Sequence, residues 1–266
     1  MSDLLDGLKA IAAAKPEYRL ADDYYEGRVA EYFANERLGQ RLTRGGRQRY
    51  AINFAKTPVN VLADRLEVAA LTVEGDDDAN ALLQEEFWEA NQLALEMPEG
   101  IKKTLIFGDE YLFVWEGEQP GTVDVWFNSP LLTRVMYDPE NPHRVAYAIR
   151  TWKAGEYQRA TLYYPETIER YITVRPGVGG ESEADWIPFL EFEGEAWPAV
   201  NPWGIPIFPM RTGLPYGRPA HRDAYGPQDA LTKLIVTMME TTDAAGTPWR
   251  YALLRADAAL SGESSL

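Results

Sequence analysis

Few side chains in this sequence could carry out catalysis, and they are far apart. The chain has no cysteine and only two histidines, His143 and His221. Each histidine follows or nearly follows a proline, so we expect both on surface loops, without the partners of a catalytic triad or a zinc site. Catalytic motifs such as the nucleophile elbow or the phosphate-binding glycine loop are also missing from the sequence. We therefore expect no enzymatic activity, no cofactor and no metal site.

Adjacent acids are the remaining catalytic candidates. Asp109 and Glu110 fall in a predicted strand, where neighbouring side chains point to opposite faces. They would then not converge as the paired acids of a glycosidase must. Acids are abundant in this chain, and we expect most of them simply to lie on the surface. A carboxylate hydrolase remains a minor alternative.

Basic residues gather in one segment, residues 37–56, which contains no acid. One hypothesis is a phosphate-contacting loop. The alternative, which we favour, is a solvated loop around two glycines, because no aromatic platform is interleaved with the arginines as in single-strand binders. The arginines that would contact phosphate are Arg41, Arg44, Arg47 and Arg49.

The whole chain is acidic, with a formal net charge of −15 over 266 residues. Such a surface opposes tight nonspecific binding to DNA or to anionic membranes. No apolar run approaches the roughly 20 residues that span a bilayer. The first residues also lack the pattern of a secretory signal peptide. We therefore expect no membrane association.

The elements that would position any site predict an α+β fold. Helices are expected over residues 1–38, with Pro16 beginning a second segment, and over 53–68, running into a strand. A further helix is expected after the acids at 76–78, which would cap it, and another over 93–107. Residues 109–193 consist of short β-rich runs separated by turns, which predicts an antiparallel meander. Most aromatic residues there should be core or sheet-face residues.

A long helix is predicted near the end of the chain. It would begin at Gly226-Pro227 and end at Gly246, because proline suits the first helical turn and glycine the end. One face carries an apolar stripe: Leu231, Leu234, Ile235, Met238 and Met239. The opposite face should meet water or a polar partner; it comprises Gln228, Asp229, Thr232, Lys233, Val236, Thr237 and Glu240. We divide the chain into 1–108 (helical), 109–225 (β-rich), 226–246 (this helix) and 247–266.

The order of five motifs resembles the portal proteins of tailed bacteriophages, specifically the siphophage-type group. No single motif is highly specific, but together they cover residues from about 50 to 255. They are NFAKTPVNVLADRLEV, GDEYLFVWEG, FNSPLLTRVMYDPENPHRVAYAIRTW with ATLYYPETIERY, NPWGIPIFPMRTG, and GPQDALTKLIVTMMETTDAAGTPWRYAL.

The resemblance implies a closed ring, usually of about twelve identical subunits, at one vertex of the capsid. Double-stranded DNA would pass through it during packaging and ejection, without sequence specificity. Its other partners would be the terminase motor, a head–tail adaptor, and capsid and scaffolding proteins. The protein would be found in the virion and, during assembly, in the host cytoplasm.

The resemblance also implies roles for the segments. Residues 1–225 would form the helical and β-rich parts of the wing, 227–245 the first stem helix and 247–266 the beginning of the clip. The stem positions that would face the tunnel or the neighbouring subunit are Lys233, Thr237, Glu240 and Thr241. Portals of this type usually continue through a second stem helix, a tunnel loop and a crown, so we expect a fragment or a reduced member.

A different class of function is a tail-associated carbohydrate- or protein-binding module built on the β-rich region. Aromatic residues can stack on sugars when they are exposed at a surface. This alternative predicts that Trp115, Trp126 or Trp152 is exposed and that its fluorescence shifts with sugar.

Overall fold

The computed structural model describes residues 2–28, 52–119, 121–213 and 215–246. Within them the fold is a mixture of helices and antiparallel sheets, as the sequence predicts. The helical elements are α1 (Ser2–Glu26), α3 (Thr57–Ala63), α4 (Asp77–Leu82), the π-helical η2 (Leu83–Glu89), α5 (Leu93–Phe107), the 3₁₀ turns η3 (Glu183–Asp185) and η4 (Arg222–Ala224), and α6 (Tyr225–Gly246). The strands are β1 (Asp109–Glu116), β2 (Val123–Asn128), β3 (Thr133–Tyr137), β4 (Val145–Ala154), β5 (Tyr157–Tyr163), β6 (Thr167–Thr173), β7 (Trp186–Pro188), β8 (Ala199–Val200) and β9 (Ile207–Arg211).

Several helix ends follow from local sequence as predicted. Asp76 caps α4, its carboxylate accepting the backbone N–H of Ala79 at 2.9 Å. Helix α5 ends at Gly108, which adopts a left-handed conformation (φ 94°) and donates its N–H to the carbonyl of Thr104. Glycine suits this position because it has no Cβ to clash there.

Two expectations for the helices are wrong. Helix α1 runs unbroken through Pro16, where a second segment was expected to begin. Its buried positions Leu4, Ile11 and Tyr18 lie on both sides of the proline, so packing along the whole length offsets the hydrogen bond that proline removes. The strand expected after α3 does not form, because residues 64–68 have no partner strand among the described residues and an unpaired strand is not stable.

The strands form two antiparallel sheets. The larger has the order β3-β4-β5-β6-β7, with β8 also paired to β6, which confirms the predicted meander from β3 onward. Strands β1 and β2, which were expected in the same meander, belong to the other sheet. The smaller has the order β2-β1-β9. Strand β9 returns from far along the chain to pair with β1, in a register that places Tyr111 opposite Pro209. The sequence pattern did not reveal this pairing, because it depends on tertiary structure.

The larger sheet has apolar residues on both faces. Helix α1 covers one face, where Leu4 and Ile11 pack against Ile149 and Leu162. Gly7 allows this close approach, since a Cβ there would lie 2.9 Å from the side chain of Ile149. Burial of each such aliphatic side chain contributes about 1.5–3 kcal/mol to folding.

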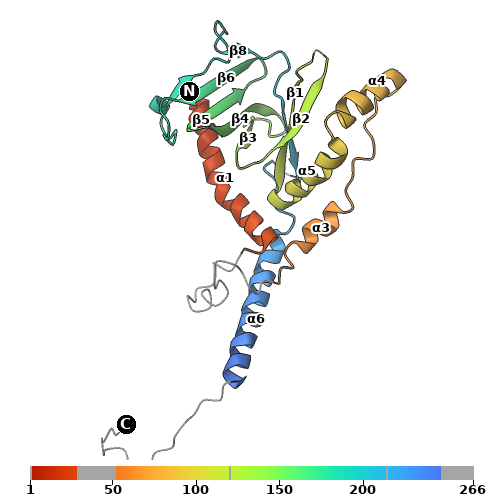
Figure 1. The fold of residues 1–266 in the computed structure, drawn as a ribbon, viewed down its shortest axis with the longest axis vertical. Coiled ribbons are helices and arrows are strands. Elements are labelled where there is room, and N and C mark those ends of the chain that lie inside the picture. The colour runs from red at the N-terminus through yellow and green to blue at the C-terminus, as the bar shows by residue number, and fades with distance from the viewer. Residues whose placement is uncertain (1, 29–51, 120, 214, 247–266) are drawn as a thin grey trace, which may run out of the picture.

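The smaller sheet covers part of the other face. Tyr111 and Phe113 of β1 are buried there against Val135, Ala148 and Tyr163 of the larger sheet. The body of the molecule is therefore layered: helix, large sheet, then small sheet with α5 beside it (Figure 1).

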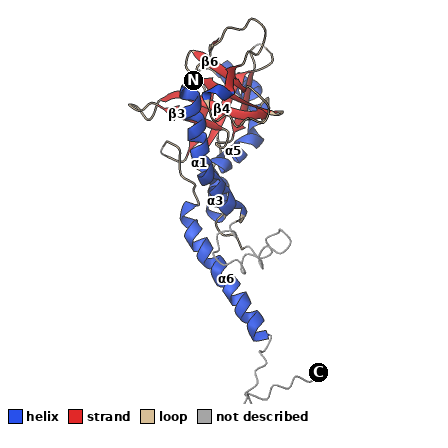
Figure 2. Ribbon diagram, turned by 90° about the vertical axis from the view of Figure 1, so that its left-hand side faces the viewer, coloured by secondary structure: helices blue, strands red, loops and turns tan. Residues whose placement is uncertain are grey.

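Helix α6 leaves this body and projects away from it (Figures 1 and 2). Its observed bounds, Tyr225–Gly246, agree with the predicted helix to within a residue. Its first turn contacts the body, and its later turns extend beyond the sheets. No helix among the described residues is long and apolar enough to cross a membrane.

Candidate functional site

The first turns of α6 are held in a polar junction beneath the sheets. The buried side chain of Gln228 donates from Nε2 to the carbonyl of Ile52 at 2.6 Å and accepts the N–H of Phe54 at 2.8 Å. One amide thus satisfies two backbone groups of a segment that has no strand partner. Both hydrogen bonds are partly buried, and together they tie the start of α6 to residues 52–54.

The end of α1 joins the same junction. The ring of Tyr24 stacks on that of Tyr225, with centroids 3.8 Å apart and an interplanar angle of 3°. The hydroxyl of Tyr24 donates to the carboxylate of Asp229 at 2.8 Å. Asn53 donates to the carbonyls of Tyr24 and Tyr25, at 3.1 and 2.7 Å. The direction of α6 is therefore set by side chains from three separate parts of the chain.

His221 lies just before α6, and the expectation that it sits on a surface loop is wrong. It is 1% exposed, and its Nε2 donates to the carbonyl of Ala21 at 2.9 Å. Burial lowers the pKa of its imidazole, so the ring is neutral at pH 7. His143, by contrast, is exposed as expected.

The segment before His221 is held tightly against the end of α5. The N–H of Ala220 donates to the carbonyl of Leu105 at 2.8 Å. Gly217 lies directly over Gly108, where a Cβ would come within 1.8 Å of its carbonyl oxygen. Residues 217–220 are therefore packed closely against the end of α5, just before His221.

The projecting part of α6 exposes both apolar and polar side chains. Leu234 is 60% exposed and Met238 67% exposed, although the sequence placed both on a face lying against something apolar. Val236 and Gln228 are buried, although both were placed on the polar face. In the single chain, the side of α6 that faces the body is therefore set by the hydrogen bonds of the polar junction and not by the apolar stripe.

Three of the four predicted stem positions are described, and all three are exposed: Lys233, Thr237 and Thr241. The hydroxyl of Thr237 donates to the carbonyl of Lys233 at 2.9 Å, and that of Thr241 to the carbonyl of Thr237 at 2.8 Å. The threonines therefore use their hydrogens within the helix and present an uncharged surface. The side chain of Glu240 lies outside the described residues.

The predicted phosphate-contacting arginines, Arg41, Arg44, Arg47 and Arg49, also lie outside the described residues. The structure does not test whether they contact phosphate or form a solvated loop.

Two carboxyl groups that were expected on the surface are instead buried at the start of β1. Asp109 accepts hydrogen bonds from the hydroxyls of Tyr18 at 2.9 Å and Tyr111 at 3.0 Å, and its burial raises its pKa. Burial raises the pKa of Glu110 to about 8, so this carboxyl is protonated at pH 7. The described residues contain no cluster of histidine and acidic side chains that could hold a metal ion.

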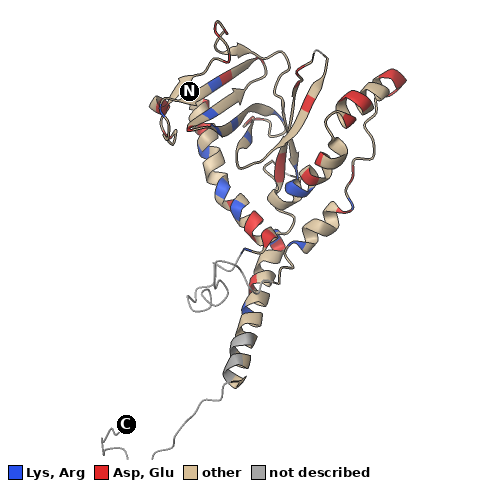
Figure 3. Ribbon diagram, viewed as in Figure 1, with Lys and Arg blue, Asp and Glu red and all other residues tan. Residues whose placement is uncertain are grey.

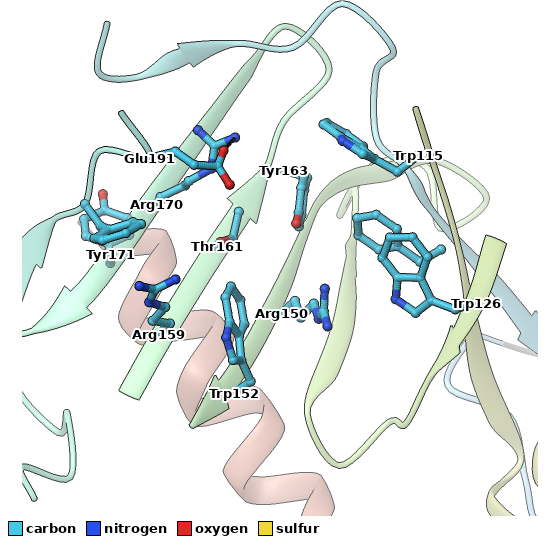
Figure 4. A pocket seen from close by; sticks show the side chains of 12 residues that line it. Trp115, Trp126, Arg150, Trp152, Arg159, Thr161, Tyr163, Arg170, Tyr171 and Glu191 are labelled. Carbon is cyan, nitrogen blue, oxygen red and sulfur yellow. Dashed lines mark ion pairs between the residues drawn. The ribbon is translucent and has the colours of Figure 1, made fainter. Parts of the chain in front are cut away.

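A cavity of about 220 Å³ lies on the face of the larger sheet that α1 does not cover (Figure 4). Three arginines on neighbouring strands β4, β5 and β6 meet aromatic rings there. The aromatic residues include Trp115, Trp126 and Trp152, each half-buried and not fully in the core. The lining residues are Phe113, Trp115, Trp126, Arg150, Trp152, Arg159, Thr161, Tyr163, Arg170, Tyr171, Phe189 and Glu191.

The pocket was not predicted from the sequence, although one local pattern pointed to it. In β4, Arg150 and Trp152 alternate with buried residues, so both must point to the same face. The residues of β1, β2 and β6 that complete the pocket could not be inferred, because these strands come together only when the two sheets form and pack.

Comparison with known proteins agrees with the motifs. No curated protein matches the chain significantly. The profile of the family described as phage portal protein, SPP1 Gp6-like, matches residues 8–198, which is more than half of the chain. This span includes most of α1, helices α3 to α5 and strands β1 to β7. The chain therefore belongs to the SPP1 Gp6-like family of phage portal proteins.

Proposed function

We propose that this chain forms the ring at one capsid vertex through which DNA is packaged and ejected. Membership in a phage portal family implies an oligomeric ring associated with the capsid. The observation that carries the finer proposal is α6, a helix anchored at one end whose exposed surface projects from the body. We assign it as the first stem helix of the ring.

Exposed apolar side chains on the projecting helix support contact with neighbouring copies. Leu234 and Met238 are 60% and 67% exposed, so complete burial of each would contribute at most about 1.5–3 kcal/mol to association. A closed ring buries one surface of each subunit against a different surface of the next. We therefore assign these two side chains to the contact between neighbouring stem helices.

The charge of α6 suits a passage for DNA. Its sequence contains one basic residue, Lys233, and three acids. Figure 3 shows that most of the helix carries no charge in its described part. Each lysine or arginine that contacts phosphate adds affinity and would retard movement. A helix of this composition lets a polyanion pass without holding it, with Lys233, Thr237, Glu240 and Thr241 facing the tunnel or the neighbour.

The remaining roles follow from the family and from position in the chain. The body, residues 1–225, would be the wing that contacts capsid and scaffolding proteins. Residues 247–266 would begin the clip, on which the terminase motor and later the head–tail adaptor dock. The hydrolysis of ATP would belong to the motor, and this chain would have a structural role.

Electron cryomicroscopy of the purified, full-length gene product tests this proposal. We expect rings in which α6 lies nearest the central opening and the two sheets lie farther out. Rings in which the sheets surround the opening and α6 points outward would contradict the assignment of α6 as a stem helix.

The alternative, a carbohydrate-binding module, has some support from the cavity lined by tryptophans. However, the guanidinium of Arg150 lies 5.0 Å from the ring centroid of Trp152 and 5.9 Å from that of Trp126. This guanidinium already makes a cation–π contact with each of the two rings, which leaves less ring surface on which a sugar could stack. Tryptophan fluorescence that is unchanged by a panel of host-surface glycans would exclude this alternative.

A further inference from the structure

The pocket on the larger sheet already binds carboxylates of its own chain. Arg170 pairs with Glu191 at 3.0 Å and with Glu195 at 2.6 Å (Figure 4 draws the first of these). Both acids belong to the segment that follows β7. The third arginine of the pocket is therefore neutralised within the single chain.

The other two arginines have no carboxylate within 4 Å among the described residues. Register places Arg150 opposite Thr161 and Trp152 opposite Arg159, so both guanidinium groups lie on the same face of the sheet. Arg150 lies near the ring of Trp152, and Arg159 lies 4.1 Å from the ring centroid of Phe189. The Nε of Arg159 is buried without a hydrogen-bond acceptor in the structure. Two positive charges with aromatic walls suit an incoming carboxylate next to an apolar side chain.

A segment of complementary character projects from the other side of the body. Residues 71–82, which we name the acidic arm, contain no lysine or arginine. Helix α4, within this arm, has no buried residue, and Leu71, Val73 and Leu82 are all exposed. Its acids are Glu74, Asp76, Asp77 and Asp78, none of which forms an ion pair with a described residue. Figure 3 shows acidic residues along this arm.

The arm and the pocket do not meet within one chain. Figure 1 shows α4 on the far side of the β1–β2 pair from the larger sheet, whereas the pocket lies between that sheet and β1–β2. Two complementary surfaces on different sides of one chain are what a head-to-tail interface requires.

We propose that the pocket receives the acidic arm of a second copy of this chain. The carboxylates of the arm bind Arg150 and Arg159, and the exposed apolar side chains beside them pack against the tryptophans. This inference rests on the proposed ring, in which each wing has an identical neighbour, and it adds a contact between wings to the contact between stem helices.

Photo-cross-linking tests this contact directly, because the natural chain has no cysteine to compete for the label. The variant Glu74→Cys, labelled with a benzophenone maleimide, is assembled and illuminated, and the attachment sites are mapped by mass spectrometry. We expect attachment to residues 150–159 or 189–191 of another chain. A matched control is Glu140→Cys, which places the same label on an exposed turn away from the arm.

Two further variants test the ion pairs from both sides. In the labelled protein, Arg150→Gln with Arg159→Gln should lower the yield of pocket cross-links about tenfold, whereas Arg175→Gln, an exposed arginine outside the pocket, should leave it unchanged. Asp77→Asn with Asp78→Asn should lower the yield similarly. These two acids are exposed, so this variant keeps the test decisive if the pocket variant fails to fold.

The outcomes separate this inference from the proposed function. Pocket cross-links that depend on these charges support the contact. Intact rings whose cross-links fall elsewhere, or are unchanged in the variants, overturn the contact and leave the ring standing. A protein that remains monomeric without cross-links between chains overturns both.

Discussion

The two ends of helix α6 differ in what surrounds them. At its first turns, Gln228 and Asp229 are bound by side chains and backbone from α1 and residues 52–54. Farther along, Leu234 and Met238 face solvent in the single chain. The first turns thus contribute to the stability of one chain, and the later turns offer a surface to other chains. This difference indicates that folding and assembly can be altered separately.

The largest effect is expected when charge is placed on the later turns. Leu234→Asp with Met238→Asp should prevent ring formation, because burying an unpaired carboxylate between helices is strongly unfavourable. The melting temperature of the single chain should stay nearly unchanged, since both side chains are exposed there. Size-exclusion chromatography with light scattering measures the first effect and circular dichroism the second. A large fall in the melting temperature of the variant monomer would contradict the proposal that the later turns serve assembly and not the stability of the single chain.

The stability of the single chain is expected to depend on pH, because of a buried carboxyl group in the body of the molecule. The pKa of Glu110 is about 8 in the folded protein, above its ordinary value of 4.5. In the unfolded chain this carboxyl ionises from about pH 4.5, whereas in the fold it stays protonated until about pH 8. Stability should therefore fall as pH rises through this window, by several kcal/mol, since each pKa unit corresponds to about 1.4 kcal/mol.

The matching variant is Glu110→Gln, which cannot ionise. Urea unfolding of the monomer at pH 5, 7 and 9 should show a smaller loss of stability with pH than the natural chain shows. Glu140→Gln, at an exposed turn, serves as the control. Equal slopes for the natural chain and Glu110→Gln would contradict the buried, protonated state of this side chain.

A smaller effect is expected at the junction. Gln228→Ala leaves the carbonyl of Ile52 and the N–H of Phe54 without their partners. The free energy of unfolding should fall by about 1–3 kcal/mol, because two hydrogen bonds are lost and each contributes about 0.5–1.5 kcal/mol. Thr237→Ala, on the projecting part of the helix, is the control and should change it by less than about 0.5 kcal/mol. Equal losses in the free energy of unfolding for the two variants would contradict the claim that the first turns of α6 stabilise the single chain more than the later turns do.

The smallest effect is expected at Lys233. Lys233→Ala removes the one basic side chain of α6, which is exposed. Neither stability nor ring formation should change measurably, and the salt dependence of DNA binding should become slightly shallower. Fluorescence anisotropy of labelled duplex DNA over a range of salt concentrations measures this slope. A steeper slope in the variant would contradict a tunnel-facing role for this lysine.

Local patterns predicted much of the fold. The bounds of α5 and α6, the cap at Asp76 and the meander through β3 to β6 all follow from periodicity, turns and capping residues close in sequence. These features depend on interactions within a few residues, so a single sequence reveals them.

Burial and long-range pairing could not be predicted in this way. His221 and Glu110 are polar residues that read as surface positions, yet both are almost fully buried. The pairing of β9 with β1 and the pocket around Arg150 each join segments far apart in the chain. Only the packing of whole elements determines these contacts, and it also exposes Leu234 on a helix whose stripe suggested burial.

The particle mass of the full-length gene product, measured by mass photometry, tests the central claim most directly. The account predicts one species near about twelve subunits for the natural protein, and a monomer for Leu234→Asp with Met238→Asp. A natural protein that stays monomeric at every concentration would contradict the proposal that the projecting part of α6 joins copies into a ring.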